Sequence, residues 1–243
     1  MVDELKNLRR PAARSWTPTG PIGRLGWLLA RLIAAFLFIS VAQVVIYKFV
    51  PVPTTLTMLM DDHPVTKDWT PLDQIDRDMV AAVISGEDGK FCLHNGFDHE
   101  AIMQAFRRNA KGGRIRGGST ISQQTAKNVF LWQGGGYLRK GLEAWYTVLI
   151  ETIWGKRRIM EVYLNVAETG IGTYGVEAGA QRYYGKSARK LSPVEAARIA
   201  AVLPLPKKRE VNGAGGFTRR HGNSIARRVA VVKNEALDAC VYR

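Results

Sequence analysis

Two acidic and two basic side chains stand at positions that favour one kind of chemistry. Glu87 and Glu143 supply carboxylates, and Lys127 and Arg139 supply positive charge. A diphosphate leaving group needs fixed cations more than a general acid, whereas an attacking sugar hydroxyl needs a base that takes its proton. The four residues therefore form a set that could carry the transfer of a sugar from a diphosphate.

Glu87 lies at the end of an expected helix and on its apolar side. Met79 and Val83 precede it in steps of four residues, so its carboxylate leaves the core-facing ridge and not the solvated face. Partial burial raises the pKa of a carboxyl group and makes it a proton acceptor near neutral pH. An acidic pair that only decorates the helix end, Glu87 with Asp88, is the competing interpretation, and this segment alone leaves both open.

The segment GGSTISQQTAKN, residues 117–128, has the composition of an anion site. Glycines permit close approach of the backbone, and a capped helix start offers unpaired amide donors. On the expected helix Lys127 shares a face with Thr120 and with Gln123 or Gln124, and together these groups could hold a diphosphate. The same residues would also make an ordinary solvated helix face. No P-loop is present, because the order GxxxxGK followed by Ser or Thr is missing.

Arg139 and Glu143 are spaced i, i+4 on the polar side of an otherwise apolar helix. Such a pair is usually a surface salt bridge that contributes little to stability. Together with Glu87 and Lys127, however, it completes the set of two carboxylates and two cations.

The elements that must position these residues are predicted to be helices, so the fold class is mainly α. Capping patterns predict a helix start at Thr70-Pro71-Leu72-Asp73, a cap at Ser119 for a helix to about Leu131, and another start at Ser192-Pro193-Val194-Glu195. No alternating apolar run is long enough for a convincing sheet. Further helices are expected from about 100 to 111, around 142–153 and from about 156.

The run from Gly26 to Val50 is long and apolar enough to cross a bilayer as a helix. Basic residues outnumber acidic ones before it, and the positive-inside rule then keeps the N-terminus in the cytoplasm. We therefore expect a cytoplasmic basic tail at 1–25, a transmembrane helix at 26–50 and an extracytoplasmic domain at 51–243. A cleaved signal peptide is the alternative, which the lack of a clear small-residue cleavage site disfavours.

The net charge of +14 predicts anionic partners, without choosing among diphosphates, anionic lipids and nucleic acid. Residues 182–243 carry fourteen Lys or Arg and four Asp or Glu, which could hold lipid headgroups or merely solvate the surface. Cys92 and Cys240 lie far apart without a CxxC pattern, so a disulfide between them is not favoured. The histidines lack metal spacing, so no cofactor is required, and the need for a divalent cation stays open.

Several segments together resemble the signature motifs of the peptidoglycan glycosyltransferase family, in the family's order and with similar spacing. They are EDGKFCLHNGFD at 87–98, GGSTISQQTAKN at 117–128, RKGLE at 139–143 and KRRIMEVYLNVAETGIGTYGVEAGAQRYYGK at 156–186. LSPVEAARIAAVLPLP at 191–206 resembles the family's closing helix. The layout resembles the monofunctional members, although the glycine-rich stretch after Pro206 departs from the pattern.

The resemblance implies a lysozyme-like helical fold with a smaller membrane-facing lobe, and polymerisation of lipid II into β-1,4-linked strands with release of undecaprenyl diphosphate. Glu87 matches the family's catalytic base, Glu143 its second glutamate, and Lys127 and Arg139 its diphosphate-binding cations. Other matched positions shape the substrate cleft: Asp88, Phe91, His94, Thr120, Gln123, Gln124 and Asn128.

The resemblance also implies partners and a location. Lipid II, the growing glycan strand and membrane lipids are expected partners, cell-wall synthesis or cell-division proteins are further candidates, and no nucleic acid is expected. The location would be the bacterial cytoplasmic membrane. Two alternatives stay in view: a lysozyme-like glycan-cleaving enzyme, which would have no use for Lys127 and Arg139, and a non-catalytic membrane-anchored scaffold, which the retained charged positions disfavour.

Overall fold

The computed structural model describes residues 20–110, 118–212 and 216–242. The chain divides into two compact units, Met1–Ala42 and Gln43–Arg243, and each is described by itself. The basic residues expected at 6–14 and most of the expected glycine-rich and arginine-rich loop, at 111–117, lie outside the described residues.

Helix α1, Pro21–Phe49, contains 29 residues and includes nearly all of the expected membrane span. At 1.5 Å per residue it is about 44 Å long, more than the roughly 30 Å of a bilayer's hydrocarbon core. Among the described residues it is the one helix long and apolar enough to cross a membrane. The guanidinium of Arg31 lies 3.3 Å from the ring centroid of Trp27, which gives this charge an aromatic partner within the apolar run.

The last turns of α1 belong to the second unit. The indole N–H of Trp154 donates to the carbonyl oxygen of Val44 at 2.7 Å, and the guanidinium of Arg158 donates to that of Tyr47 at 2.8 Å. Tyr47 lies in the last turn of α1, where carbonyl groups run out of intrahelical partners, and Arg158 satisfies its carbonyl oxygen.

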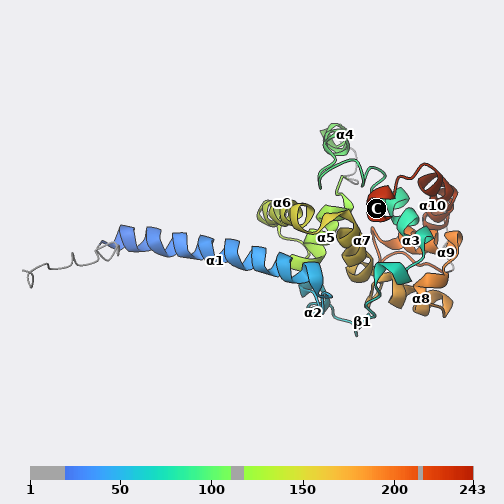
Figure 1. Ribbon diagram of the computed structural model, residues 1–243, viewed down its shortest axis with the longest axis horizontal. Coiled ribbons are helices and arrows are strands. Elements are labelled where there is room, and N and C mark those ends of the chain that lie inside the picture. Colours follow the sequence, from blue (N-terminus) through green and yellow to red (C-terminus); the bar gives the residue numbers. More distant parts are fainter. Residues whose placement is uncertain (1–19, 111–117, 213–215, 243) are drawn as a thin grey trace, which may run out of the picture. The chain divides into compact units, whose positions relative to one another are not determined.

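The second unit is mainly helical, as expected, with one small sheet (Figure 1). Its elements in chain order are α2 (Leu56–Leu59), β1 (Thr66–Lys67), η2 (Leu72–Gln74), α3 (Arg77–Glu87), α4 (His99–Ala110), α5 (Ile121–Phe130), α6 (Gly136–Ile153), α7 (Gly155–Val166), β2 (Glu168–Gly170), β3 (Thr173–Tyr174), α8 (Val176–Tyr184), η3 (Ala188–Lys190), α9 (Pro193–Val202), α10 (Gly216–Asn234) and α11 (Ala239–Tyr242).

Two groups of packed helices form the core. In one, α3 packs against α9 and α10, and in the other, α5 packs against α6 and α7. Helix α3 is central because every residue from Met79 to Ile84 is fully buried. The strands, in the order β1-β3-β2, are only two or three residues long. They are too short to produce an alternation of apolar and polar residues that the sequence could reveal.

Two of the expected helix starts are wrong. Thr70 does not cap a helix: its backbone N–H donates to the side-chain oxygen of Asn165 at 2.7 Å, a short 3-10 turn follows, and α3 begins only after its cap Asp76. Helix α5 is capped by Thr120 and not by Ser119. The expected capping box of Ser192 with Glu195 is present.

Cys92 and Cys240 form a disulfide, so the expectation against this bond is wrong. The two residues are 148 positions apart, yet α10 packs along α3 and returns the C-terminal α11 to the loop that follows α3. Their Cα atoms lie 5.5 Å apart as a result. A second link holds α11, because the Arg77 guanidinium donates to both oxygens of the fully buried Asp238 at 2.7 and 2.8 Å.

Candidate active site

The loop after α3 is held against the first turn of α5 by Asp88. One of its oxygens accepts from the backbone N–H of Ile121 at 3.0 Å, and the other from His94 Nε2 at 2.9 Å. His94 Nδ1 accepts from the Gly96 N–H at 3.2 Å, which puts the ring proton on Nε2, where it faces the carboxylate. His94 is thus a hydrogen-bonded structural group of this loop.

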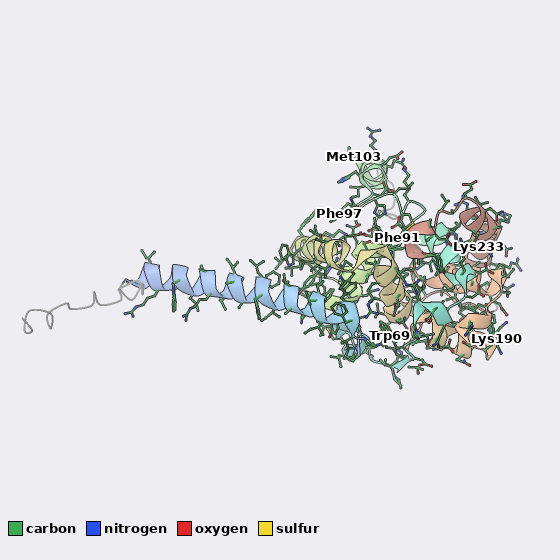
Figure 2. The ribbon with its side chains drawn as sticks, in the orientation of Figure 1. Trp69, Phe91, Phe97, Met103, Lys190 and Lys233 are labelled. Carbon is green, nitrogen blue, oxygen red and sulfur yellow. A yellow bond between two sulfur atoms is a disulfide. The ribbon has the colours of Figure 1, made fainter. Side chains whose placement is uncertain are left out.

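Three more of the expected cleft residues belong to the same structural frame, which consists of the loop after α3 and the first turn of α5. Thr120 and Gln123 form a capping box, and the Thr120 hydroxyl also donates to the carbonyl oxygen of Gly96 at 2.6 Å. Phe91, labelled in Figure 2, is fully buried. Lys156 Nζ lies 4.5 Å from its ring centroid. These contacts fix the loop that follows Glu87 relative to α5.

Gly96 is the residue of this frame that tolerates substitution least. Its φ of +90° lies in the left-handed region, and an added Cβ would meet Thr147 Cγ2 at 2.7 Å. The conformation alone costs an alanine about 1–2 kcal/mol, and the steric overlap adds to this cost. Gly96→Ala is therefore expected to lower the midpoint of thermal unfolding by several degrees, followed by circular dichroism. Gly89, where an added Cβ meets nothing within 4 Å, is the matched control. An unchanged midpoint in Gly96→Ala would contradict this assignment.

Glu87 ends α3 as a half-buried carboxylate with one oxygen uncommitted. Its Oε2 accepts from the side-chain amide of Gln124 at 3.0 Å, while Oε1 is buried without a hydrogen-bond partner among the described residues. Tyr163 donates its hydroxyl to the amide oxygen of Gln124 at 3.2 Å, which turns the amide nitrogen toward Glu87. The expectation that Glu87 faces the core side of its helix is confirmed.

Burial is the main cause that raises the pKa of Glu87 above its ordinary value. The hydrogen bond from Gln124 and the charges of Arg209 and Lys127 oppose this effect, and the neighbouring Asp88 adds to it. A carboxyl group in this state suits proton acceptance near neutral pH.

A cationic cluster of Lys127, Arg139 and Lys140 surrounds Glu143, and Lys127 lies about one helical turn beyond Gln124 on α5. Arg139 Nη1 lies 2.7 Å from Glu143 Oε2, and Lys140 contacts the other oxygen of the same carboxylate. Glu143 is only 2% exposed, so this is not the ordinary surface pair that the i, i+4 spacing usually denotes. Burial lowers the pKa of Lys127, Glu143 opposes that change, and Arg139 and Lys140 reinforce it. Three basic side chains thus gather around one carboxylate, and positive charge is in excess.

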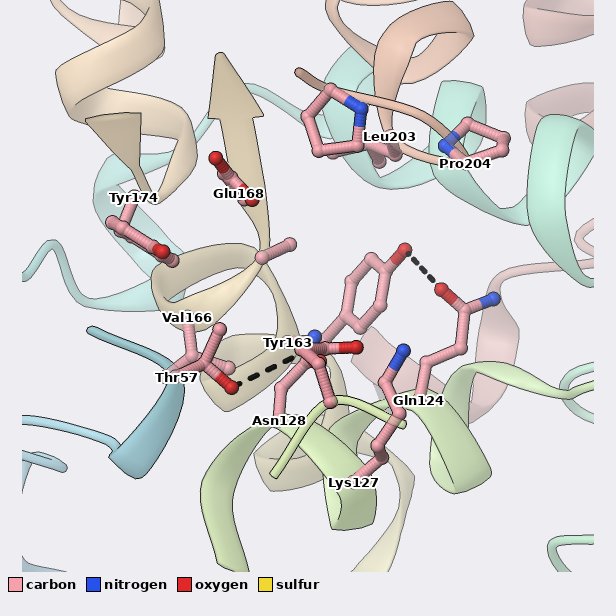
Figure 3. Close-up of a pocket in the computed structure, with 13 residues that line it drawn as sticks. Thr57, Gln124, Lys127, Asn128, Tyr163, Val166, Glu168, Tyr174, Leu203 and Pro204 are labelled. Carbon is pink, nitrogen blue, oxygen red and sulfur yellow. Dashed lines mark hydrogen bonds between the residues drawn. The ribbon is translucent and has the colours of Figure 1, made fainter. Parts of the chain in front are cut away.

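Lys127 projects into a cavity of about 150 Å³ (Figure 3). Helix α5 supplies one wall with Gln124, Lys127 and Asn128, and the sheet supplies another with Glu168 and Tyr174. Glu87 and Arg139 are not among the lining residues. They are connected to the cavity instead through Gln124, which bonds Glu87, and through Glu143, whose charge reaches Lys127.

Sequence reasoning did not single out four residues near the site, namely Tyr163, Glu168, Tyr174 and Arg209. The sequence does contain one indication of Glu168, because it is the one acidic residue in the otherwise uncharged stretch VAETGIG at 166–172. Among the described residues no group of three or more His, Cys, Asp or Glu could hold a metal ion.

Comparison with known proteins identifies the family. A family model described as transglycosylase matches residues 54–235. The chain belongs to the transglycosylase family. This transglycosylase is 48% identical over 221 residues to a biosynthetic peptidoglycan transglycosylase of Caulobacter vibrioides, a match that covers 88% of this chain and 96% of the relative.

Two further relatives carry the same name. That of Rhodospirillum centenum is 45% identical, with 90% of this chain and 97% of the relative covered. That of Pasteurella multocida is 44% identical, with 86% and 89% covered. The predicted resemblance is confirmed, and the transglycosylase is a glycosyltransferase.

Proposed function

We propose that this transglycosylase polymerises lipid II into the β-1,4-linked glycan strands of peptidoglycan and releases undecaprenyl diphosphate. One observation supports the proposal: Glu87 keeps Oε1 without a hydrogen-bond partner among the described residues, while its Oε2 accepts from Gln124 on the helix that presents Lys127 to the cavity. The names of the three relatives support peptidoglycan as the product.

Glu87 acts as the general base. Its Oε1 takes the proton of the GlcNAc 4-hydroxyl of an acceptor lipid II as that oxygen attacks C1 of the terminal MurNAc of the growing strand. The new C1–O bond forms on the face opposite the diphosphate, and the bond from C1 to the diphosphate oxygen breaks with its electron pair on the leaving group. The proton on Glu87 then passes to solvent.

Lys127 and Arg139 stabilise the charge that develops on the departing diphosphate. Preorganised charges of this kind act strongly where water is excluded, and Lys127 is largely desolvated. Glu143 holds the Arg139 guanidinium in place at 2.7 Å. Asp88, Phe91, His94, Thr120 and Gln123 position these groups from the frame, and Gln124 and Asn128 shape the cavity wall.

Labelled lipid II distinguishes synthesis from cleavage. Purified full-length chain is expected to convert it into polymer of increasing length, resolved by gel electrophoresis. A glycan-cleaving enzyme would instead need a general acid for a poor sugar leaving group. Degradation of pre-formed glycan strands without any polymer would reverse the assignment. If neither polymer nor degradation products form, the result would favour the non-catalytic scaffold.

The membrane topology proposed from the sequence, a cytoplasmic tail at 1–25 and an extracytoplasmic domain at 51–243, gains support from the disulfide. Disulfides persist in oxidising compartments outside the cytoplasm, and Cys92 is bonded to Cys240. A single pass through the bacterial cytoplasmic membrane would leave the second unit at the lipid surface where its substrate is anchored. A reporter that functions only in the cytoplasm can be fused after Arg243, and activity of that fusion would contradict this orientation.

Gln124 offers a test of the base through pH. Its hydrogen bond favours the ionised form of Glu87 and so lowers the pKa of that carboxyl. Gln124→Leu removes the bond, so the acid limb of the profile of kcat/KM against pH is expected to move to higher pH. Gln181→Leu is the control, because Gln181 lies on α8 and bonds Glu177. A profile of Gln124→Leu that coincides with the wild-type profile would argue against Glu87 as the titrating base.

A further inference from the structure

Glu168 occupies the cavity wall supplied by the sheet and has no part in the mechanism described so far (Figure 3). Its side chain is 14% exposed, and Oε1 is buried without a hydrogen-bond partner among the described residues. The ammonium of Lys207 lies 3.8 Å from Oε1, which is beyond hydrogen-bond distance. A buried polar atom on a cavity wall is costly unless something that enters the cavity bonds it.

Three side-chain donors near Glu168 bond another acid, Asp61. Tyr174 donates its hydroxyl to Asp61 at 2.6 Å, Lys207 approaches the same oxygen at 3.0 Å, and His63 bonds the other oxygen. The bond from Tyr174 is the main cause that holds the pKa of Asp61 well below its usual range. Asp61 therefore takes these side-chain donors, and Glu168, which has the backbone N–H of Gly172 nearby, keeps Oε1 without a hydrogen-bond partner among the described residues.

Burial raises the pKa of Glu168 to about 7. Asp61 adds to this shift, whereas Lys207, the backbone N–H of Gly172 and His63 oppose it. Across the cavity stands the cation Lys127. At neutral pH both the protonated and the ionised form of the carboxyl group are therefore populated, so it can either donate or accept a hydrogen bond.

The chemistry of the two walls orients a sugar diphosphate. Diphosphate oxygens are repelled by a carboxylate and attracted to Lys127. A sugar hydroxyl or an acetamido group, by contrast, donates and accepts hydrogen bonds without charge and suits Glu168 in either state.

We propose that Glu168 is a substrate-binding residue that hydrogen-bonds an uncharged hydroxyl or acetamido group of the sugar and so orients the substrate against the cation on α5. This inference rests on the proposed function and adds a specificity-determining contact to it. Loss of one such bond weakens binding by about 1.4 kcal/mol, which corresponds to roughly tenfold.

Kinetics of the full-length chain with lipid II test this role. Glu168→Ala is expected to raise KM about tenfold with a smaller change in kcat, and Glu168→Gln, which keeps donor and acceptor atoms, to stay within about threefold of wild type. The matched control is Glu235→Gln, since Glu235 is exposed in the turn after α10. A KM for Glu168→Ala equal to that of the control would overturn the proposal.

A second readout covers the case in which Glu168→Ala fails to fold. KM of the wild type is expected to rise as pH increases through about 7, because the ionised carboxylate repels the diphosphate of the substrate in the same cavity, and Glu168→Gln is expected to lose that rise because its amide does not titrate. Identical pH profiles of KM would overturn the proposal. If the wild type makes polymer but Glu168→Ala keeps the KM of the control or the pH profiles coincide, only the role of Glu168 is refuted. If the wild type makes no polymer, the proposed function is refuted and this inference with it.

Discussion

Replacing Glu87 with glutamine is expected to slow glycan polymerisation by about a hundredfold to ten-thousandfold, the usual contribution of general acid–base catalysis. The amide has almost the same shape but cannot take the proton of the attacking hydroxyl. The fold should persist, because the amide oxygen of the new side chain can still accept the hydrogen bond from Gln124 that Glu87 accepts at 3.0 Å. Initial rates with labelled lipid II measure the loss.

Two controls make this result specific to the base. Glu235→Gln makes the same chemical change at an exposed position and is expected to keep the wild-type rate. The thermal midpoint of Glu87→Gln should equal or exceed that of wild type, since the substitution removes a carboxyl group whose pKa is raised by burial and so relieves a desolvation cost. Wild-type turnover by Glu87→Gln would exclude Glu87 as the base.

Replacing Lys127 with methionine is expected to reduce the polymerisation rate by about a hundredfold to a thousandfold, as for the loss of one preorganised charge. Methionine keeps much of the side-chain length but loses the ammonium group that lines the cavity. A second effect should accompany the first: the charge of Lys127 lowers the pKa of Glu87, so its removal should move the acid limb of the profile of kcat/KM to higher pH.

Lys190→Met is the matched control for this substitution. Lys190, labelled in Figure 2, is exposed on η3. It is not among the residues that line the cavity and should tolerate the change. Lys127→Arg restores the charge with a different shape, so partial recovery of rate is expected. If Lys127→Met and Lys190→Met polymerise lipid II equally fast, the leaving group does not depend on Lys127.

Local signals were sufficient where the interactions are local. The capping box of Ser192 and Glu195 involves residues three apart, and the position of Glu87 follows from the periodicity of a single helix. Distant interactions decided the failures. Thr70 is held by Asn165, which is 95 residues away, and this bond replaces the expected helix cap.

The same distinction applies to the site. Glu87, Lys127, Arg139 and Glu143 were selected by residue type and motif, and the structure connects them through Gln124 and through the electrostatic field around Glu143. The sequence alone could not tell which of the expected residues hold the loop after α3 in place and which line the cavity. Thr120, for example, caps α5 and bonds the carbonyl of Gly96, and that bond depends on where the loop lies.

Glu168 shows why some functional candidates escape sequence reasoning. Its open oxygen exists because Tyr174 and Lys207 donate to Asp61, more than a hundred positions away in the chain. The disulfide between Cys92 and Cys240 is similar, because it requires the packing of α10 along α3 before the two thiols can meet.

The structure of the chain with an unreactive lipid II analogue bound would test the central claim most directly. We expect the acceptor 4-hydroxyl oxygen to lie within about 2.6–3.2 Å of Glu87 Oε1, the reach of a general base. We also expect diphosphate oxygens beside the side chains of Lys127 and Arg139. A 4-hydroxyl bonded to a different carboxylate, with the diphosphate away from both cations, would contradict the account.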